Sequence, residues 1–561
     1  MSTTPLWFGP EDRPLFGWLH VPEDGRARGA VVLCPPIGNE LAHSHYSLRL
    51  LACALADAGL VALRFDYFGT GDSSGNQHDP DQVAQWLQSI DQATDLARSL
   101  VPGAAVACVG LRLGATLAAT AAARSSVYSA LALWDPCLSG ASFMREQRAR
   151  LAMASRGGAS HDDGVEVPGY VLTTETVDDI RTLSLASLEG ALPPRALLLK
   201  DPARPRDARL DGLVEALGLD VEEYREAVQV FDTGELRFQP PRPVIAQLAA
   251  WIDGTFTDEP VEVAQPAPNA SATVGEDIDG GPLVETLLRL GPAALFAVST
   301  SAPELEPDGP PILLLSVAGE PRSGPARQWA ELARRWAVEG YSVVRLDLSG
   351  LGDSPARPGR EERITYAPEA LDDIADAARE LSPSDPSNVI LVGLCSGASA
   401  ALAAAPLLRP RKVIAVNPLL IHPAFDMLST ERRPRTRRRA GYLPRFAQPL
   451  AWRYIYGLSA EYSPRRILKP LVESGVPMFY VCGEGEAKPF LGRGNGKLRR
   501  LVMPRDVEVV VVPGLDHSLL VRSSREAVAR LITRHLEQAY PPPQAARSRQ
   551  SGAPASPAAL R

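Results

Sequence analysis

The chain of 561 residues is 45% hydrophobic and 22% charged, with a formal net charge of −8. This length exceeds what one hydrophobic core usually serves, so we expect two domains. The negative charge gives no electrostatic footprint for nucleic acid, and we expect no partner of that class. No apolar run is long enough for a membrane span, and the first residues lack the apolar segment of a signal peptide, so we expect a cytoplasmic protein.

Six cysteines are scattered singly along the chain, without a CxxC pair or a spacing typical of metal ligands. Cys34, Cys108 and Cys482 lie in or at the end of apolar, strand-like runs. We interpret them as small buried hydrophobes in a reducing compartment. The sequence therefore predicts no metal site and no cofactor.

In the first half of the chain, strand-like and helix-like segments alternate. GAVVLC at 29–34 is a short continuous apolar run, as expected of a buried parallel strand. A helix-length segment at 45–59 ends at a glycine, and the strand-like runs VALRFD (61–66) and AVACVG (105–110) follow, with a helix between them. This alternation predicts an α/β domain whose mostly parallel sheet is covered by helices on both faces.

The turn after the last of these strands reads CVGLRLGA (108–115) and carries Arg112 at its centre. A guanidinium stays protonated and cannot act as a nucleophile, and the late loop of this half contains no histidine, so we expect this half to be catalytically silent. Two interpretations of Arg112 stay open. It forms a cationic niche for a carboxylate or phosphate, with Glu40 and His45 nearby. Alternatively it pairs with Glu40 or Asp72 and plugs a vestigial pocket, which is the interpretation we favour.

Residues 257–282 are rich in proline, alanine and acids and show no periodicity, so we interpret them as a linker. The last residues, 541–561, have a similar bias and are expected to form a disordered tail.

The second half of the chain repeats the first at an offset of about 280 residues. The segment ADAGLVALRFDYFGTGDSSG aligns with AVEGYSVVRLDLSGLGDSPA, and LALWDP (131–136) with VIAVNP (413–418). The aligned pairs include Gly59 and Gly340, Arg64 and Arg345, and Asp66 and Asp347. We therefore predict a tandem duplication, with domains at 1–256 and 283–540. Features present in both copies, including the two aspartates, are expected to belong to the scaffold.

The turn equivalent to that of Arg112 reads LVGLCSGA (391–398), between a buried strand and an alanine-rich helix. A nucleophile on such a strained turn needs very small residues two positions before and after it. Gly393 and Gly397 satisfy this for Cys395, whereas Ser396 would have larger neighbours. We favour Cys395 as the nucleophile, at a helix N-terminus that favours a thiolate.

A nucleophile needs a base, and the base needs an acid that orients it. VEVVVVPGLDHSLL is a strong strand followed by a loop that carries His517, our candidate base. For the acid, Glu486 follows the strand VPMFYVCG and is our first choice, with Glu484 and Asp516 as alternatives. A pair of solvated loop glutamates is the competing interpretation of this segment.

An oxyanion would be stabilised by two backbone N–H groups near the nucleophile. The candidates are the N–H of Ser396 and one from the loop SVAGEP, at Ala318 or Gly319.

Both halves resemble α/β-hydrolase domains, over about 1–256 and 283–540. GLRLGA and LWDP of the first half are similar to the serine-aminopeptidase-like branch, which includes hydrolases of bacterial exopolysaccharide and exosortase systems. The resemblance implies that Cys395 is the nucleophile, Glu486 the acid and His517 the base. Two departures stand out. Cysteine replaces the usual serine, as in dienelactone hydrolases and the G-x-C-x-G box of polyhydroxyalkanoate synthases, and glutamate replaces the commoner aspartate.

The resemblance also implies that the excursions at 138–192 and 419–474 form caps. The second contains a run of arginines between 432 and 445, which is either a solvated face or an attractor for an anionic acyl group linked to CoA or a carrier.

We therefore expect a cysteine-dependent acyl hydrolase or acyltransferase, which acts on an ester or thioester of a small molecule through a covalent thioester intermediate. The two domains are expected to pair with each other. The alternative is a tandem pseudo-hydrolase that binds ligands or proteins without catalysis.

Overall fold

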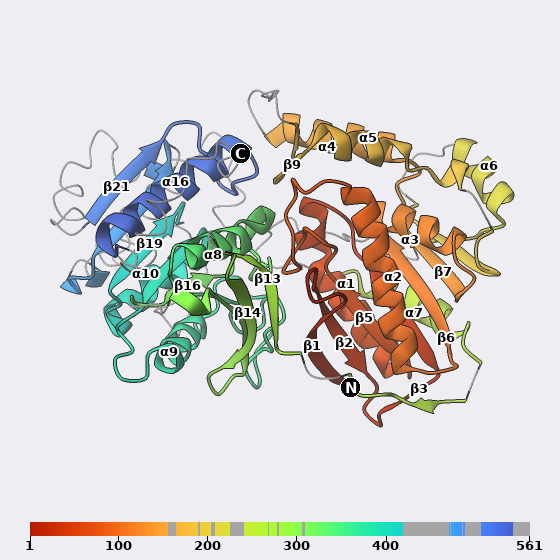
Figure 1. Cartoon of the computed structure of the whole chain (residues 1–561), viewed down its shortest axis with the longest axis horizontal. Helices are drawn as coiled ribbons and strands as arrows, with labels where there is room; N and C mark the ends of the chain where they lie inside the picture. The colour runs from red at the N-terminus through yellow and green to blue at the C-terminus, as the bar shows by residue number, and fades with distance from the viewer. Residues whose placement is uncertain are drawn as a thin grey trace, which may run out of the picture.

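The computed structural model describes residues 1–154, 164–188, 191–202, 208–224, 240–257, 259–266, 269–277, 280–305, 309–418, 470–471, 473–484, 486–487 and 507–541. Two sheets, each flanked by helices, lie side by side (Figure 1). Within the described ranges, no helix combines the length and hydropathy that a membrane crossing requires.

The first sheet has eight strands, and its centre is parallel. The antiparallel edge strands precede it in sequence, and helices α1 and α7 pack on one face while α2 and α3 pack on the other. The strand order is β1 (Ser2–Phe8), β2 (Leu15–Val21), β5 (Val61–Phe65), β4 (Gly29–Cys34), β6 (Ala105–Leu111), β7 (Tyr128–Trp134), β10 (Arg195–Lys200) and β11 (Asp220–Glu223). The helices are α1 (Asn39–Asp57), α2 (Gln82–Leu100), α3 (Leu113–Ala123), α6 (Ala208–Leu217) and α7 (Arg242–Asp253).

The excursion at 138–192 folds over one end of the first sheet. Its described part consists of α4 (Gly140–Ala154), β8 (Val165–Val167), β9 (Tyr170–Leu172), α5 (Thr174–Thr182) and the short helix η1 (Leu185–Ser187). Strands β8 and β9 form a two-stranded antiparallel hairpin, which reaches toward the second half of the chain (Figure 1).

The second sheet has nine strands, and from β14 onward its order and strand directions reproduce those of the first sheet. Helices α8 and α16 pack on one face, and α9 and α10 on the other. The strand order is β13 (Ser271–Glu276), β14 (Pro282–Leu290), β15 (Leu295–Ser301), β17 (Val343–Leu346), β16 (Ile312–Leu315), β18 (Ile390–Leu394), β19 (Lys412–Val416), β20 (Met478–Gly483) and β21 (Val507–Val512). The helices are α8 (Gln328–Val338), α9 (Ala370–Leu381), α10 (Ser396–Leu408) and α16 (Arg522–Ala539), with short turns η2 (Pro303–Leu305) and η3 (Pro325–Arg327).

The predicted α/β class, with mostly parallel sheets covered by helices, is confirmed. The segment 257–282, which we interpret as a linker, contains two short edge strands. Strand β12 (Val261–Glu262) pairs with β3 (Arg26–Ala27) of the first half, and β13 pairs with β14. These strands are edge strands with mostly exposed side chains, so they lack the apolar pattern that would reveal them in sequence.

Aromatic side chains from both halves form one apolar cluster where the edge strands meet. Trp7, Phe16 and Trp18 of the first half pack with Phe296 and Val298 of the second, and all are buried. The rings of Phe16 and Phe296, which occupy equivalent positions in the two halves, stack with centroids 6.2 Å apart. The contact therefore has the self-complementary character of an interface between two copies of one domain.

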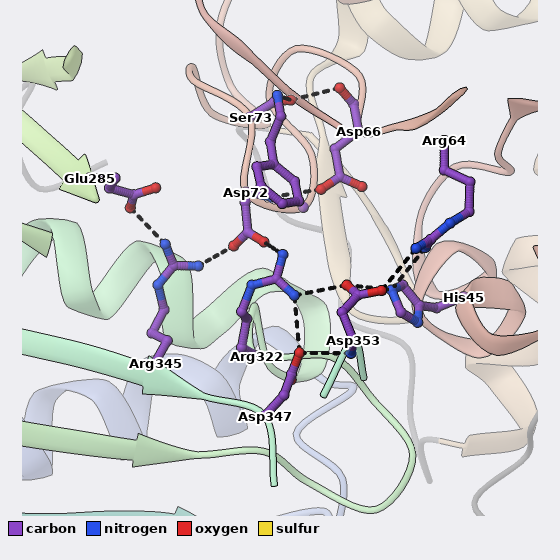
Figure 2. Close-up of polar contacts among 12 residues, drawn as sticks. His45, Arg64, Asp66, Asp72, Ser73, Glu285, Arg322, Arg345, Asp347 and Asp353 are labelled. Carbon is purple, nitrogen blue, oxygen red and sulfur yellow. Dashed lines mark hydrogen bonds and ion pairs between the residues drawn. The ribbon is translucent and has the colours of Figure 1, made fainter. Parts of the chain in front are cut away.

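The loops that carry the repeated GxGDS motif exchange ion pairs across this contact (Figure 2). Arg64 of the first half binds Asp353 of the second at 2.9 Å, and the equivalent Arg345 of the second half binds Asp72 of the first. Each aspartate also has the same local role, because the N–H of Asp72 and that of Asp353 donate to the carboxylate six residues earlier. The repeated motif thus builds both the local turn and the contact with the other half.

Arg322 lies at the centre of this network and binds three carboxylates. Its guanidinium is 2.5 Å from Asp72, 3.0 Å from Asp347 and 2.9 Å from Asp353, and all four side chains are buried (Figure 2). Burial raises the pKa of Asp347 to about 6, against the opposing effect of Arg322. The charges of His45, Arg64 and Arg322 outweigh burial at Asp353 and hold its pKa well below the usual range.

We predict that Arg322→Ala lowers the free energy of unfolding by about 3–5 kcal/mol, because it leaves buried carboxylates without a counter-charge. Without Arg322 the pKa values of these carboxyl groups rise in the folded state. The folded variant then binds more protons than the unfolded chain, and it therefore loses stability as the pH rises. The loss measured by urea denaturation should therefore be larger at pH 8 than at pH 5.

The matched control is Arg530→Ala, which removes an arginine from an exposed i,i+4 pair with Glu526. Its expected cost is below about 1 kcal/mol. A loss for Arg322→Ala that is as small as the control's, or the same at both pH values, would contradict the role of the network.

Candidate active site

Cys395 stands at the turn between β18 and α10, in a backbone conformation that favours glycine. Its φ is 52° and its ψ is −112°, and its N–H donates to the carbonyl of Val416 at 2.9 Å. Such a conformation costs a non-glycine residue about 1–3 kcal/mol and persists only where the surroundings enforce it. A Cβ on Gly393 would lie 2.3 Å from the carbonyl carbon of Gly397, and one on Gly397 would lie 2.7 Å from the oxygen of Ser316. Glycine is therefore required on both sides of Cys395.

Three side chains that the sequence predicts for the site form one hydrogen-bonded chain. His517 Nε2 lies 3.1 Å from Cys395 Sγ, and His517 Nδ1 lies 3.2 Å from Glu486 Oε1. Cys395 ends β18, Glu486 follows β20 and His517 follows β21, so all three lie at the carboxyl ends of parallel strands. The imidazole thus bridges a sulfur and a carboxylate.

The environment of His517 favours its protonated form. The hydrogen bond to Cys395 raises the pKa of His517 to about 9, with further contributions from the charges of Cys395 and Glu486 and an opposing effect of burial. The imidazole beside the sulfur is therefore placed to hold a proton.

The two alternative acids have other positions. The carboxylate of Asp516 accepts hydrogen bonds from the N–H groups of Leu520 and Val521, at 2.6 and 3.3 Å, and so fixes the loop that carries His517. Glu484 is exposed. Of the three carboxylates considered, Glu486 is the one hydrogen-bonded to His517.

Asn417 also holds the histidine loop, and the sequence reasoning did not identify it. Its Nδ2 donates to the carbonyls of Asp516 and His517 at 3.2 and 3.1 Å, and its Oδ1 accepts from the N–H of Gly483 at 3.0 Å. The side chain therefore ties β19 to the loops after β20 and β21. The signal was present in the sequence as the asparagine of VNP, which stands where the first half has the aspartate of WDP.

A second contact of the sulfur was also missed. Tyr366, between β17 and α9, lies beside Cys395. Burial, followed by the charge of Cys395 and a hydrogen bond with it, raises the pKa of the tyrosine. No motif marks this tyrosine, which reaches the site through a loop.

The predicted oxyanion groups lie around the same turn. The N–H of Ala318 donates to the hydroxyl of Ser396 at 2.7 Å, so this hydroxyl takes the hydrogen bond that the N–H would otherwise give to an oxyanion. Arg363 covers Gly319: it donates to the carbonyl of that glycine, and a Cβ there would lie 1.8 Å from its guanidinium. Ser396, Ala318 and Gly319 are thus close together, with the Ser396 hydroxyl already bound within the group.

In the first half, the turn of Arg112 has nearly the same backbone as that of Cys395, with φ 58° and ψ −121°. The guanidinium is 1% exposed and lies 3.4 Å from Glu40, 3.6 Å from Asp135 and within ion-pair distance of Glu146. This arrangement corresponds to the plug rather than to an open anion niche.

Two residues that the two interpretations place near Arg112, Asp72 of the plug and His45 of the niche, lie elsewhere. Asp72 does not pair with Arg112, since it binds Arg322 and Arg345 across the contact between the halves. His45 does not join the niche either: its Nε2 lies 3.1 Å from Asp353 of the second half. Both residues were assigned to the nearer pocket because sequence proximity does not show which way a loop faces.

The excursion at 419–474 lies almost entirely outside the described residues, and so does the arginine run at 432–445. In the described part of the chain, no group of three or more histidine, cysteine, aspartate or glutamate side chains is arranged to hold a metal ion.

We predict that the stabilising effect of His517 depends on pH. Its folded-state pKa of about 9 lies above the ordinary value of 6.5, so its contribution is fully present below about pH 6.5 and is lost as the pH rises through about 9. The melting temperature of His517→Gln should therefore fall below that of the wild type by more at pH 6 than at pH 10.

His535 provides the matched control, because burial lowers its pKa to about 4. For His535→Gln the difference from the wild type should shrink as the pH falls from 6.5 toward 4, which is the opposite dependence. A pH-independent difference for His517→Gln would show that its imidazole is not held as a cation.

Residues 312–531 match the alpha/beta hydrolase family. No curated protein matches the chain significantly. Among solved structures, the serine hydrolase XC6422 of Xanthomonas campestris is 15% identical, covers 47% of this chain and 98% of its own, and has a TM-score of 0.32.

Two other solved structures give similar values. Est1E of Butyrivibrio proteoclasticus is 15% identical, with coverage of 45% and 98% and a TM-score of 0.33. A thioesterase domain from the curacin biosynthetic pathway is 20% identical, with coverage of 45% and 99% and a TM-score of 0.29. The family match thus covers residues 312–531, and the two helix-flanked, mostly parallel sheets have the α/β-hydrolase fold.

Proposed function

We propose that the second half of the chain is a cysteine-dependent acyl hydrolase or acyltransferase that acts on esters or thioesters. The observation that carries the proposal is the hydrogen-bonded chain from Cys395 through His517 to Glu486, with distances of 3.1 and 3.2 Å. Nucleophile, base and orienting acid in this order are the requirement for covalent acyl transfer.

In the first step, Nε2 of His517 takes the proton of the Cys395 thiol, and the sulfur attacks the acyl carbonyl carbon. The resulting tetrahedral oxyanion collapses and expels the alcohol or thiol, which takes a proton from the imidazolium. The products are the leaving group and a thioester on Cys395. His517 then deprotonates water or an acceptor, whose attack on the thioester releases the acyl group and returns the sulfur.

The groups around the turn supply the remaining functions. Glu486 holds the imidazole tautomer and stabilises its cation. The N–H groups of Ser396 and Ala318 would bind the oxyanion, for which the Ser396 hydroxyl has to release the N–H of Ala318. The Ser396 hydroxyl therefore occupies the site until substrate arrives.

The first half would contribute no chemistry of its own, since Arg112 stands in the place of Cys395 and is buried among carboxylates. The repeated strand order supports a tandem duplication in which the two halves act as one unit. We further propose a small-molecule acyl substrate, with a CoA or carrier link as the form that the arginine run at 432–445 would attract.

The test is a panel of chromogenic esters and acyl thioesters. Cys395→Ala and His517→Ala should each lower kcat/KM by about a thousandfold or more, and Glu486→Gln by about ten- to a hundredfold, because the acid acts only through the imidazole. An activated ester should leave an acyl adduct on Cys395, located by peptide mass mapping, and Ser396→Ala should retain that adduct.

The control is Cys53→Ala, which removes a partly exposed cysteine of α1. It should keep the wild-type rate. Unchanged turnover in both Cys395→Ala and His517→Ala would overturn the enzyme proposal and leave the tandem pseudo-hydrolase that binds without catalysis. Products formed with and without an acceptor alcohol or amine separate hydrolysis from transfer.

A further inference from the structure

The hairpin β8–β9 of the first half contacts the loop that carries His517 in the second. The N–H of Gly169 donates to the carbonyl of Leu520 at 2.9 Å. Three residues earlier, on β8, the carboxylate of Glu166 accepts a hydrogen bond from the N–H of Arg522 at 2.6 Å. These bonds join the cap of the first half to the end of the histidine loop.

Glu166 supplies what the start of α16 lacks. This helix begins at Arg522, and its N-cap residue Val521 offers no side-chain hydrogen bond. The first N–H groups of a helix need acceptors, and an anion there is stabilised by the helix dipole. Glu166 is 7% exposed and meets this need from the other half of the chain.

The hairpin fits closely at this point. Gly169 has φ +80°, and a Cβ on it would lie 3.0 Å from the Cβ of Ala326 in the second half. The left-handed backbone and the close approach both require glycine there. The turn is therefore shaped for contact with the second half.

The contact is connected to His517 by a short loop that several hydrogen bonds hold in place. Asp516 binds the N–H groups of Leu520 and Val521, and Arg525 of α16 donates to the carbonyl of Leu520 at 2.7 Å. On the inner side, Asn417 holds the carbonyl of His517. The loop is thus fixed from within by Asn417 and from outside by the hairpin.

We propose that Glu166 is a positioning residue for His517, so that the first half of the chain holds the base of the second half in place. The proposal rests on the proposed function, because it assigns His517 to Cys395. The loss of a nucleophile at Arg112 is compatible with this role, since the hairpin acts through its backbone and one carboxylate.

A second set of contacts also connects the first half to loops near Cys395. Helix α1 of the first half lies against two loops of the second half. His43 is 3.9 Å from Glu320, which is in the loop after β16, and Tyr46 donates a hydrogen bond to Glu362, in the loop between β17 and α9, at 2.7 Å. Both loops that flank Cys395 are therefore in contact with the first half.

The experiment measures the alkylation rate of Cys395 by iodoacetamide between pH 6 and pH 10, by peptide mass mapping of the full-length chain. In the wild type the rate at pH 6 should be a large fraction of the rate at pH 10, because the imidazolium of His517 lies beside the sulfur. In Glu166→Ala we expect about a tenfold lower rate at pH 6 and a rate within about twofold of the wild type at pH 10, where a thiol ionises without a partner.

Glu166→Gln keeps an oxygen acceptor without the charge, and it should lie between the wild type and Glu166→Ala. The matched control is Glu526→Gln, one turn further along α16, which pairs with the side chains of Arg522 and Arg530 and not with the histidine loop. Its pH profile should be that of the wild type. If Glu166→Ala does not fold, Glu166→Gln decides by the same comparison.

A wild-type pH profile in the folded Glu166 variants, or a loss equal at all pH values, would overturn the positioning role. A failure of the proposed function gives a different result. In that case Cys395 of the wild type itself would react at pH 6 as slowly as an ordinary thiol, and His517→Ala would not change its rate.

Discussion

The ion pairs around Arg322 are the constraint on which the arrangement of the two halves depends. The three buried aspartates depend on Arg322, because its removal would leave buried carboxylates without this counter-charge. The network takes one carboxylate from the first half and two from the second, and the exchange of Arg64 and Arg345 surrounds it. Rotation or separation of the halves would break several buried pairs at once. The histidine loop and the oxyanion loop therefore meet the first half in a fixed orientation.

The two strained turns have nearly the same backbone conformation but different side-chain surroundings. Cys395 and Arg112 have nearly identical dihedral angles, and each is held by an N–H bond to the end of the next strand, at Val416 and Trp134. The fold enforces this conformation in both halves through the flanking glycines. What differs is the environment of the side chain: a histidine and a tyrosine beside the sulfur, and three carboxylates around the guanidinium. At one turn the side chain thus contacts a histidine, and at the other it is held in a cluster of ion pairs.

Much of the candidate site follows from local sequence rules, and the remainder does not. Cys395 is marked by its glycines and His517 by its strand, because the carboxyl ends of parallel strands gather at one edge of a sheet. Only the tertiary structure distinguishes Glu486 from the other two carboxylates, since all three follow strands at that edge. Tyr366 and Glu166 carry no sequence signal, because packing sets the direction of the loop that carries Tyr366 and of the hairpin that carries Glu166.

The sequence by itself determined the α/β class, the internal repeat of motifs and the residue that stands at each strained turn. These are properties of periodicity, of glycine and of side-chain chemistry, which act over a few residues. The tertiary structure decided that the GxGDS loops face each other, that His45 and Asp72 serve the contact between the halves, and that a hairpin of the first half caps a helix of the second. Those facts depend on which surfaces meet, and contacts between residues some 300 positions apart leave no local pattern.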